Sequence, residues 1–169
     1  AAKAGATILN DVQGLQDPEM QEVSALFEET ILMHSRGNSQ TMMNLTQYDN
    51  IIEELRVFFQ KQIAVCRSPK IWLDPGIGFA KTALQSLEIL AKTDQFTNLG
   101  HPVLIGASRK SFIGAILNQP KAEQRLLGSL TAVTLAYQRG ATAFRVHDVA
   151  ETKEVLNFLQ AVEIFDKER

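Results

Sequence analysis

Residues 72–82, WLDPGIGFAKT, place a carboxylate directly behind an apolar run and follow it with a proline and two glycines. The proline restricts the backbone after Asp74, whereas Gly76 and Gly78 let it turn sharply and approach a flat ligand. A carboxylate held in this way can accept two parallel hydrogen bonds from the N–H and NH2 groups of a planar heterocycle. A local role as a helix cap is the alternative, but eight residues separate Asp74 from Thr82, where the next helix is expected to start.

Polar side chains also lie at or just past the carboxyl ends of the other apolar runs, and they are Asn10, Asp11, His34, Arg36, Ser108, Arg109, Lys110, Arg145, His147 and Asp148. Arg145 and His147 alternate on the last run, so an extended strand would project both to one side. Arg offers a planar fork for phosphate oxygens and His adds a donor, which favours a phosphate grip over a salt bridge or a core polar group. Asp148 is expected to cap the following helix, with Glu151 completing a capping-box-like pattern.

Five short apolar runs are the expected strands, at residues 7–12, 30–34, 70–74, 102–106 and 143–147. Segments with apolar residues at three- and four-residue steps are the expected helices, at residues 18–28, 46–66, 83–93, 109–117, 122–139 and 150–165. Apolar runs of this kind are typical of parallel strands that are covered on both faces. Strand starts recur every 23 to 41 residues, the length of a β-α unit.

Repeated β-α units leave two architectures, an open doubly wound sheet and a (β/α)8 barrel. In a barrel, polar residues at the carboxyl ends of the strands gather on one face, where the active sites of that fold lie. An open sheet would use one switch point, usually with a G-x-G-x-x-G turn behind the first strand, and the sequence has no such turn. The α/β class and the C-terminal five-eighths of a TIM-type (β/α)8 barrel are therefore expected.

Five strands cannot close an eight-stranded barrel, so residues 1–169 are expected to form one N-terminally incomplete domain that lacks the first three units. The chain has no initiator Met, and its opening, AAKAGATILNDV, is typical of a helix end running into a strand. A length of 169 residues and an apolar content of 45% indicate one globular core.

Charge and cysteine content exclude several function classes. The formal net charge is −2 without a long run of one sign, which argues against nucleic-acid and membrane partners. The sequence contains one cysteine, so no intrachain disulfide is possible, and Cys–His zinc spacing is absent. Neither a membrane-length apolar run nor a secretory signal is found.

Six consecutive segments resemble the motifs of the dihydropteroate synthase family, in that family's order and over nearly the whole chain. They are NDVQG, MHSRG, LDPGIGFAKT, GASRKSFIG, RLLGSLTAVTLAYQRGA and RVHDVAET. The resemblance implies a barrel that condenses 6-hydroxymethyl-7,8-dihydropterin diphosphate with para-aminobenzoate, giving 7,8-dihydropteroate and diphosphate in folate synthesis. It also implies a target of sulfonamides, a homodimer, and a location in the cytoplasm, or in mitochondria for a eukaryotic multifunctional enzyme.

The resemblance also implies a role for each site residue. Asn10, Asp74 and Lys110 would bind the pterin, with Met33, Gly78, Phe79 and Gly106 lining the pocket. Ser108, expected at a helix N-terminus, and Arg109 would hold the aminobenzoate carboxylate, while Arg145 and His147 would bind the diphosphate. Lys110, Asp74, Arg145 and His147 would therefore carry catalysis, by positioning and by neutralising the leaving group.

Mg²⁺ is the cofactor that the resemblance implies, bridging diphosphate oxygens. The family's protein ligand for it is an asparagine on the first strand of the barrel, so no metal ligand is expected within this chain.

Two other functions stay open. A related pterin-binding barrel transfers a methyl group from methyltetrahydrofolate to a corrinoid, but the SRK and RVH segments argue against it. A non-catalytic half-barrel is the second.

Overall fold

The computed structural model describes residues 1–167. Five parallel strands run side by side in chain order, β1 (Ile8–Asp11), β2 (Glu29–Met33), β3 (Lys70–Asp74), β4 (Leu104–Ile105) and β5 (Ala143–Phe144). A bridge between Leu73 and Val103 joins the first three strands to the last two. This order, in which each strand pairs in parallel with the next along the chain, is the wall of a β/α barrel.

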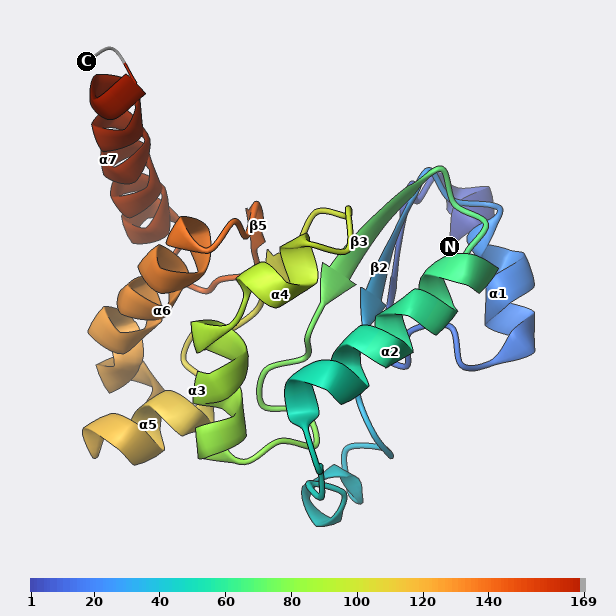
Figure 1. Cartoon of the computed structure of the whole chain (residues 1–169), viewed down its shortest axis with the longest axis horizontal. Helices are drawn as coiled ribbons and strands as arrows, with labels where there is room; N and C mark the ends of the chain where they lie inside the picture. Colours follow the sequence, from blue (N-terminus) through green and yellow to red (C-terminus); the bar gives the residue numbers. More distant parts are fainter. Residues whose placement is uncertain (168–169) are drawn as a thin grey trace.

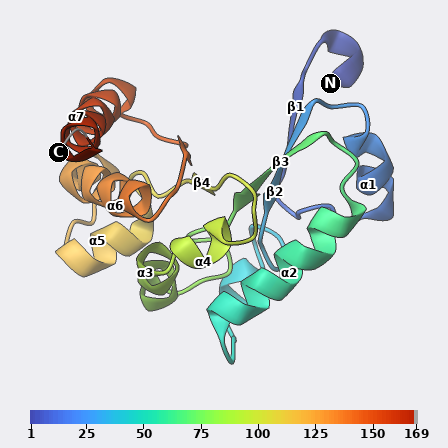
Figure 2. The ribbon, with the colours of Figure 1, turned by 45° about the horizontal axis from the view of Figure 1, so that its top comes forward.

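Helices follow the strands and lie along one side of their curved row (Figures 1 and 2). They are α1 (Pro18–Ser24), α2 (Ile51–Val65), α3 (Ala83–Ala91), α4 (Asp94–Thr97), α5 (Ser111–Leu117), α6 (Leu126–Gln138) and α7 (Val149–Lys167). Three 3-10 turns accompany them, η1 (Ala2–Ala4), η2 (Met42–Asn44) and η3 (Ala122–Arg125). None of the helices within residues 1–167 is long and apolar enough to cross a membrane.

Most predicted elements are confirmed, and the differences lie at their ends. The third strand matches its prediction, whereas β4 and β5 are two residues long instead of five. Helix α2 starts at residue 51 rather than 46, because the Asn50 side chain accepts a hydrogen bond from the Glu53 amide and caps it there. The short helix α4 was not predicted, and the expected helix at 122–139 is a 3-10 turn followed by α6.

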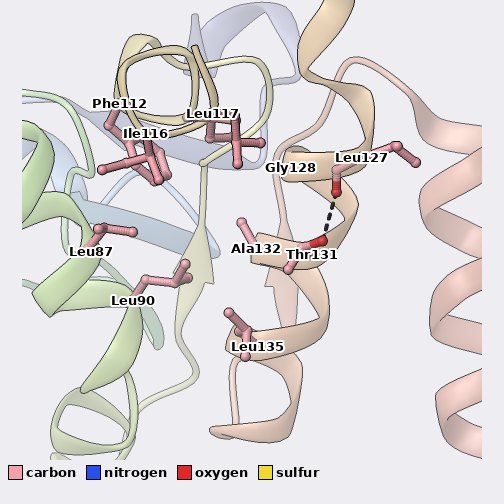
Figure 3. A pocket seen from close by; sticks show the side chains of 11 residues that line it. Leu87, Leu90, Phe112, Ile116, Leu117, Leu127, Gly128, Thr131, Ala132 and Leu135 are labelled. Carbon is pink, nitrogen blue, oxygen red and sulfur yellow. Dashed lines mark hydrogen bonds between the residues drawn. The ribbon is translucent and has the colours of Figure 1, made fainter. Parts of the chain in front are cut away.

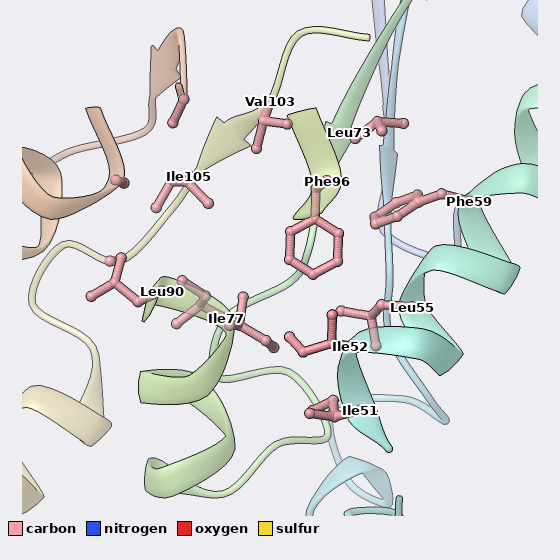
Figure 4. Packing of buried hydrophobic residues seen from close by; sticks show 14 of the residues in the cluster. Ile51, Ile52, Leu55, Phe59, Leu73, Ile77, Leu90, Phe96, Val103 and Ile105 are labelled. Carbon is pink, nitrogen blue, oxygen red and sulfur yellow. The ribbon is translucent and has the colours of Figure 1, made fainter. Parts of the chain in front are cut away.

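The hydrophobic core fills the space between the strands and helices α2 to α4 (Figure 4). Leu73 points from β3 toward Phe59 of α2, and the Phe59 ring meets the Phe96 ring edge to face at 6.0 Å between centroids. Both phenylalanines are fully buried. Burial of such a side chain stabilises the fold by about 1.5–3 kcal/mol, so this layer fixes the strands on which the polar residues sit.

Within residues 1–167 the helices cover one face of the strands, and much of the other face is partly exposed. Residues alternate along the strands, so that Leu32 and Leu73 are buried against helices while Glu29 and Trp72 of the opposite face stay partly exposed. Ile8 on that same opposite face is half exposed. The helices pack on one face alone, and in a closed barrel the other face would line the interior.

Candidate functional site

Asp74, at the carboxyl end of β3, is the buried carboxylate of the site, with 3% of its surface exposed. Its Oδ1 accepts a hydrogen bond of 2.8 Å from the Gly76 amide. The cap of α3 is Thr82, whose hydroxyl accepts from the Gln85 amide, so Asp74 is not the cap of that helix. Burial raises the pKa of Asp74, whereas the Gly76 amide and three nearby cations, Lys110, Arg145 and Lys81, lower it.

The loop behind Asp74 requires glycine at residue 76. Gly76 has a φ of +66°, and a Cβ built on it would overlap the carbonyl oxygen of His34. Gly78 has a φ of +80°, and a Cβ there would come within 3.2 Å of the Lys110 Cδ atom. The predicted sharp turn is therefore confirmed, and its second glycine lets the Lys110 side chain lie across the loop.

Lys110 precedes α5 and reaches back over this loop. Its Nζ donates to the Ile77 carbonyl and lies 4.6 Å from the centroid of the Phe79 ring. Burial lowers the pKa of Lys110 to about 8, although the Asp74 carboxylate raises it. An ammonium, an aromatic ring and a carboxylate thus meet at the carboxyl end of β3.

The Arg145 side chain connects the carboxyl end of β5 to the carboxyl end of β1. Its Nη2 donates to the Asn10 Oδ1 at 2.6 Å, and its Nη1 lies 3.7 Å from the Asp74 Oδ2. The Arg145 side chain is half exposed. The guanidinium therefore contacts two of the predicted pterin residues, Asn10 and Asp74, at the groups that a ring edge would need.

His147 has a different partner from Arg145. Its Nδ1 lies 3.1 Å from the Ser108 hydroxyl, and its backbone amide donates to the same oxygen at 3.2 Å. The two residues of the Arg-x-His pair therefore have separate partners, Ser108 for His147 and Asn10 with Asp74 for Arg145. Ser108 is buried and lies three residues before α5, so its expected place at the N-terminus of that helix is wrong.

Arg109 lies between Ser108 and α5, and its backbone is left-handed, with a φ of +56°. The Arg109 amide donates to the Ser129 hydroxyl at 2.8 Å, and its carbonyl accepts from the Arg125 Nη1 at 2.9 Å. Its guanidinium makes a two-pronged pair with the Asp148 carboxylate, which lowers the pKa of Asp148. Asp148 directly precedes α7, and its carbonyl accepts a hydrogen bond from the Thr152 amide, so it lies at the predicted N-cap position while its carboxylate pairs with Arg109.

Two further predicted pocket residues lie beside this group. Met33 is opposite Asp74 in the strand register, so both side chains belong to the same face of the sheet. Met33 is almost fully buried. Gly106 lies next to Arg145, with 3.8 Å between a Cβ built on Gly106 and the Arg145 Cβ.

Two buried or half-buried residues of this region, Lys81 and Tyr48, were not predicted as site residues. Lys81 is 3% exposed, and its Nζ contacts the His34 ring and the carbonyls of His34 and Phe79. The Tyr48 hydroxyl donates to the Ala80 carbonyl at 3.1 Å. The one sequence signal was the lysine itself, placed in a glycine-rich loop that is otherwise apolar.

An apolar groove of about 230 Å³ lies between α3, α5 and α6 (Figure 3). Its lining is aliphatic apart from one aromatic ring, one glycine and one threonine, and it includes Leu87, Leu90, Phe112, Leu117, Leu127 and Leu135. Such a lining offers almost no partner to a polar heterocycle, so the candidate site is the polar group at the strand ends. Within residues 1–167, no group of three or more His, Cys, Asp or Glu side chains could hold a metal ion.

The row of parallel strands and the converging polar residues at their carboxyl ends define part of a β/α-barrel enzyme. Residues 1–147 match the family described as "Pterin binding enzyme". A dihydropteroate synthase of Synechocystis sp. is 43% identical, over 96% of this chain and 58% of that protein. The Thermus thermophilus dihydropteroate synthase, crystallised with 6HMPPP, is 35% identical over 95% of this chain and 66% of its own, with a TM-score of 0.89.

The dihydropteroate synthase of Xanthomonas albilineans, in complex with 7,8-dihydropteroate, is 36% identical over 95% of this chain and 61% of its own, with a TM-score of 0.85. This chain belongs to the pterin-binding enzyme family, and the relatives named above are dihydropteroate synthases. Its strands form part of the TIM-type barrel of those enzymes. The chain spans 58% of the length of the Synechocystis relative.

Proposed function

We propose that this chain supplies the pterin and diphosphate site of a dihydropteroate synthase in folate synthesis. The observation that carries the proposal is the convergence of Asn10, Asp74, Lys110 and Arg145 at the carboxyl ends of four strands. A carboxylate, an amide and an ammonium can pair with the donors and acceptors of an aminopyrimidinone edge. Relatives crystallised with 6HMPPP and with 7,8-dihydropteroate support the same ligand class.

Binding of the ring begins with the displacement of Arg145. The amino-pyrimidine edge of the pterin hydrogen-bonds to the Asp74 carboxylate and to the Asn10 amide. These are the two groups that Arg145 contacts in the structure. Lys110 donates to an oxygen or nitrogen acceptor of the ring, and Phe79 forms the apolar wall beside it. Arg145 then moves to the diphosphate, where its fork matches phosphate oxygens.

The transfer forms a C–N bond between the aminobenzoate nitrogen and the pterin methylene and breaks the C–O bond to diphosphate. The nitrogen loses one proton, and the electron pair of the C–O bond leaves with the diphosphate. Arg145 and His147 stabilise the negative charge that builds on the leaving oxygen. No covalent intermediate on the protein is needed, so positioning of the two substrates accounts for most of the rate.

The aminobenzoate site is proposed beside Ser108, next to the diphosphate residues. The Ser108 hydroxyl contacts His147, which brings the two subsites together. Arg109 contributes to that subsite chiefly by holding the turn, because its guanidinium is paired with Asp148. The corrinoid methyltransferase alternative has no need of a diphosphate grip, so no observation in this site favours it.

The proposal also includes three features that the resemblance to dihydropteroate synthases implies. They are Mg²⁺ as the cofactor, a homodimer and a cytoplasmic location. Mg²⁺ would help to neutralise the diphosphate, and the steps above describe the part taken by side chains of this chain. Exposed apolar side chains of α6 and α7, Leu127 and Phe158, support a second copy as partner, since dimer formation would cover them. Sedimentation equilibrium of the purified chain tests the dimer.

An assay of dihydropteroate formation tests the proposed function. It uses the purified chain and a fusion that adds the portion of the Synechocystis relative that this chain does not match. With Mg²⁺ and both substrates, the fusion should form dihydropteroate, and Asp74→Asn should lower kcat/KM by about a hundredfold. Absence of product together with absence of pterin binding by either protein would overturn the proposal.

A further inference from the structure

Lys81 is a buried cation that the proposed reaction does not use. It ends the loop that connects β3 to α3, and 3% of its surface is exposed. A lysine is rarely buried to this extent, because its ammonium loses hydration and its long side chain can usually reach water. Its place inside the protein therefore depends on the groups that surround its Nζ atom.

Three acceptors surround that atom. The Lys81 Nζ lies 2.9 Å from the Phe79 carbonyl oxygen, 3.3 Å from the His34 carbonyl oxygen and 3.0 Å from the His34 Nδ1. Burial lowers the pKa of His34 to about 3, so its ring is neutral and Nδ1 can accept. The three protons of an ammonium thus have three partners, and one side chain joins the end of β2 to the 75–81 loop.

The loop depends on such contacts because its backbone is strained. Gly76, Gly78 and Ala80 all have positive φ, which is unfavourable for alanine. The loop carbonyls are held by side chains from other elements, namely that of Ile77 by Lys110 and that of Ala80 by Tyr48. Lys81 adds the contact to the His34 carbonyl, the same atom that excludes a side chain at residue 76.

We propose that Lys81 is a positioning residue of the pterin pocket, which fixes the 75–81 loop on the end of β2 and so places the Phe79 ring and the Asp74 carboxylate. The contacts of Lys81 with the His34 and Phe79 carbonyls are observed in the structure. The effect on pterin binding rests on the proposed function. Lys81 itself touches neither substrate in this account.

The charge of the Lys81 ammonium supports the same positioning role. Burial lowers the pKa of Lys81 to about 7, the Asp74 carboxylate raises it, and Lys110 and Arg36 lower it. The neutral amine keeps two N–H groups for the two carbonyls, and its lone pair then accepts from the other His34 tautomer. Either protonation state therefore holds the loop. When charged, Lys81 also favours the ionised form of Asp74 after Arg145 has moved away.

Amide hydrogen exchange of the ligand-free chain tests the loop contact. The variant is Lys81→Met, and the control is Lys92→Met, which removes an exposed lysine paired with Glu88. Exchange at the Gly76 and Phe79 amides, which are hydrogen-bonded within the loop, should become about tenfold faster in Lys81→Met. Exchange at the Leu73 amide, bonded to the Pro102 carbonyl, should not change.

Titration with 6-hydroxymethyl-7,8-dihydropterin tests the consequence for the pocket. Its Kd should rise about tenfold in Lys81→Met and stay unchanged in the Lys92→Met control. Lys81→Gln, which keeps an NH2 donor group, replaces the Met variant if that chain does not fold. Failure of the unmutated chain to bind the pterin would overturn the proposed function, while the exchange measurement still decides the loop contact.

Three results would overturn the role of Lys81. The first is unchanged loop exchange in a folded Lys81 variant. The second is exchange that becomes faster throughout the chain, and not only in the loop, in both Lys81→Met and Lys81→Gln. That result would mean that Lys81 stabilises the whole fold. The third is faster loop exchange with unchanged pterin affinity in a chain that binds the ligand. Local loss of protection together with weaker binding supports the proposal.

Discussion

The guanidinium of Arg145 donates to the amide oxygen of Asn10 at 2.6 Å, although the two residues are 135 positions apart. This contact spans the row of strands from β5 to β1 and brings a cation onto the residues proposed for the pterin ring. Under the proposed function, the pterin ring and Arg145 compete for Asn10 and Asp74, and we propose that pterin binding releases the arginine toward the diphosphate.

Removal of this arginine should separate recognition of the leaving group from recognition of the ring. Arg145→Ala is expected to weaken binding of the pterin diphosphate by about 1.5–3 kcal/mol, the range for a hydrogen bond to a charged group. The same change should leave the affinity for 6-hydroxymethyl-7,8-dihydropterin unchanged or higher, since the competitor is gone. Binding isotherms for both ligands measure the difference.

His147→Ala should act in the same direction as Arg145→Ala but more weakly. Arg67→Ala is the matched control, because Arg67 forms an exposed pair with Glu22. Equal losses for both pterins in Arg145→Ala would assign Arg145 to the ring pocket or to the fold instead.

The carboxylate of Asp74 should decide affinity for the ring. Asp74→Asn keeps an oxygen for the Gly76 amide but turns an NH2 group toward the donors of the pterin. Binding should weaken by about 2–4 kcal/mol, through loss of a charge-assisted bond and opposition of two donors. Isothermal titration calorimetry with the pterin diphosphate measures the loss.

Thermal unfolding of Asp74→Asn is the control for folding, and its midpoint should not fall, because burial disfavours the charge that the variant removes. Asp94→Asn, at an exposed position, should bind the ligand normally. Unchanged affinity in Asp74→Asn would remove this residue from the ring edge.

The pair of Arg109 and Asp148 should behave as one unit. Arg109→Ala and Asp148→Ala are each expected to loosen the turn that carries Ser108 and Lys110, because the left-handed backbone of Arg109 is held from three sides. The double variant should lose little more stability and affinity than either single variant. Urea unfolding and pterin titration of the four proteins complete the cycle, and additive losses would show that the pair is not coupled.

Stability should rise with pH between about 7 and 9.5. The folded pKa values of Lys81 and Lys110, about 7 and about 8, lie below the ordinary value of 10.5. In this window the unfolded chain binds protons that the folded chain has released, so the free energy of unfolding increases with pH. The slope is at most about 1.4 kcal/mol per pH unit for each group.

Urea unfolding at several pH values measures this slope. Lys81→Met should remove the contribution that begins near pH 7 and leave the one that begins near pH 8. Above pH 10 the raised pKa values of Tyr48 and Tyr137 act in the opposite direction, so that range is left out. A stability that is flat or falls from pH 7 to 9.5 would contradict the burial of the two ammonium groups.

Local sequence was enough to predict the Asp74 loop, because its carboxylate, proline and glycines are neighbours whose backbone preferences act together. The third strand was predicted to the residue for a similar reason, since its apolar run ends at a polar residue and a proline. Strand order followed from repeated β-α units, which leave few topologies.

Contacts between distant segments could not be predicted in the same way. The partners of Arg145 and Arg109 depend on the curvature of the strand row, which sets where each long side chain ends. Lys81 resembles a surface lysine in the sequence, and its burial arises from the way the loop folds onto His34.

A crystal structure of the chain with 6-hydroxymethyl-7,8-dihydropterin diphosphate tests the central claim most directly. We expect the amino-pyrimidine edge within hydrogen-bonding distance of the Asp74 carboxylate and the Asn10 amide, with Lys110 turned from the Ile77 carbonyl to the ring. Arg145 should have left Asn10 for the diphosphate. A ligand bound elsewhere, or one bound at Asp74 with Arg145 still on Asn10, would contradict the account.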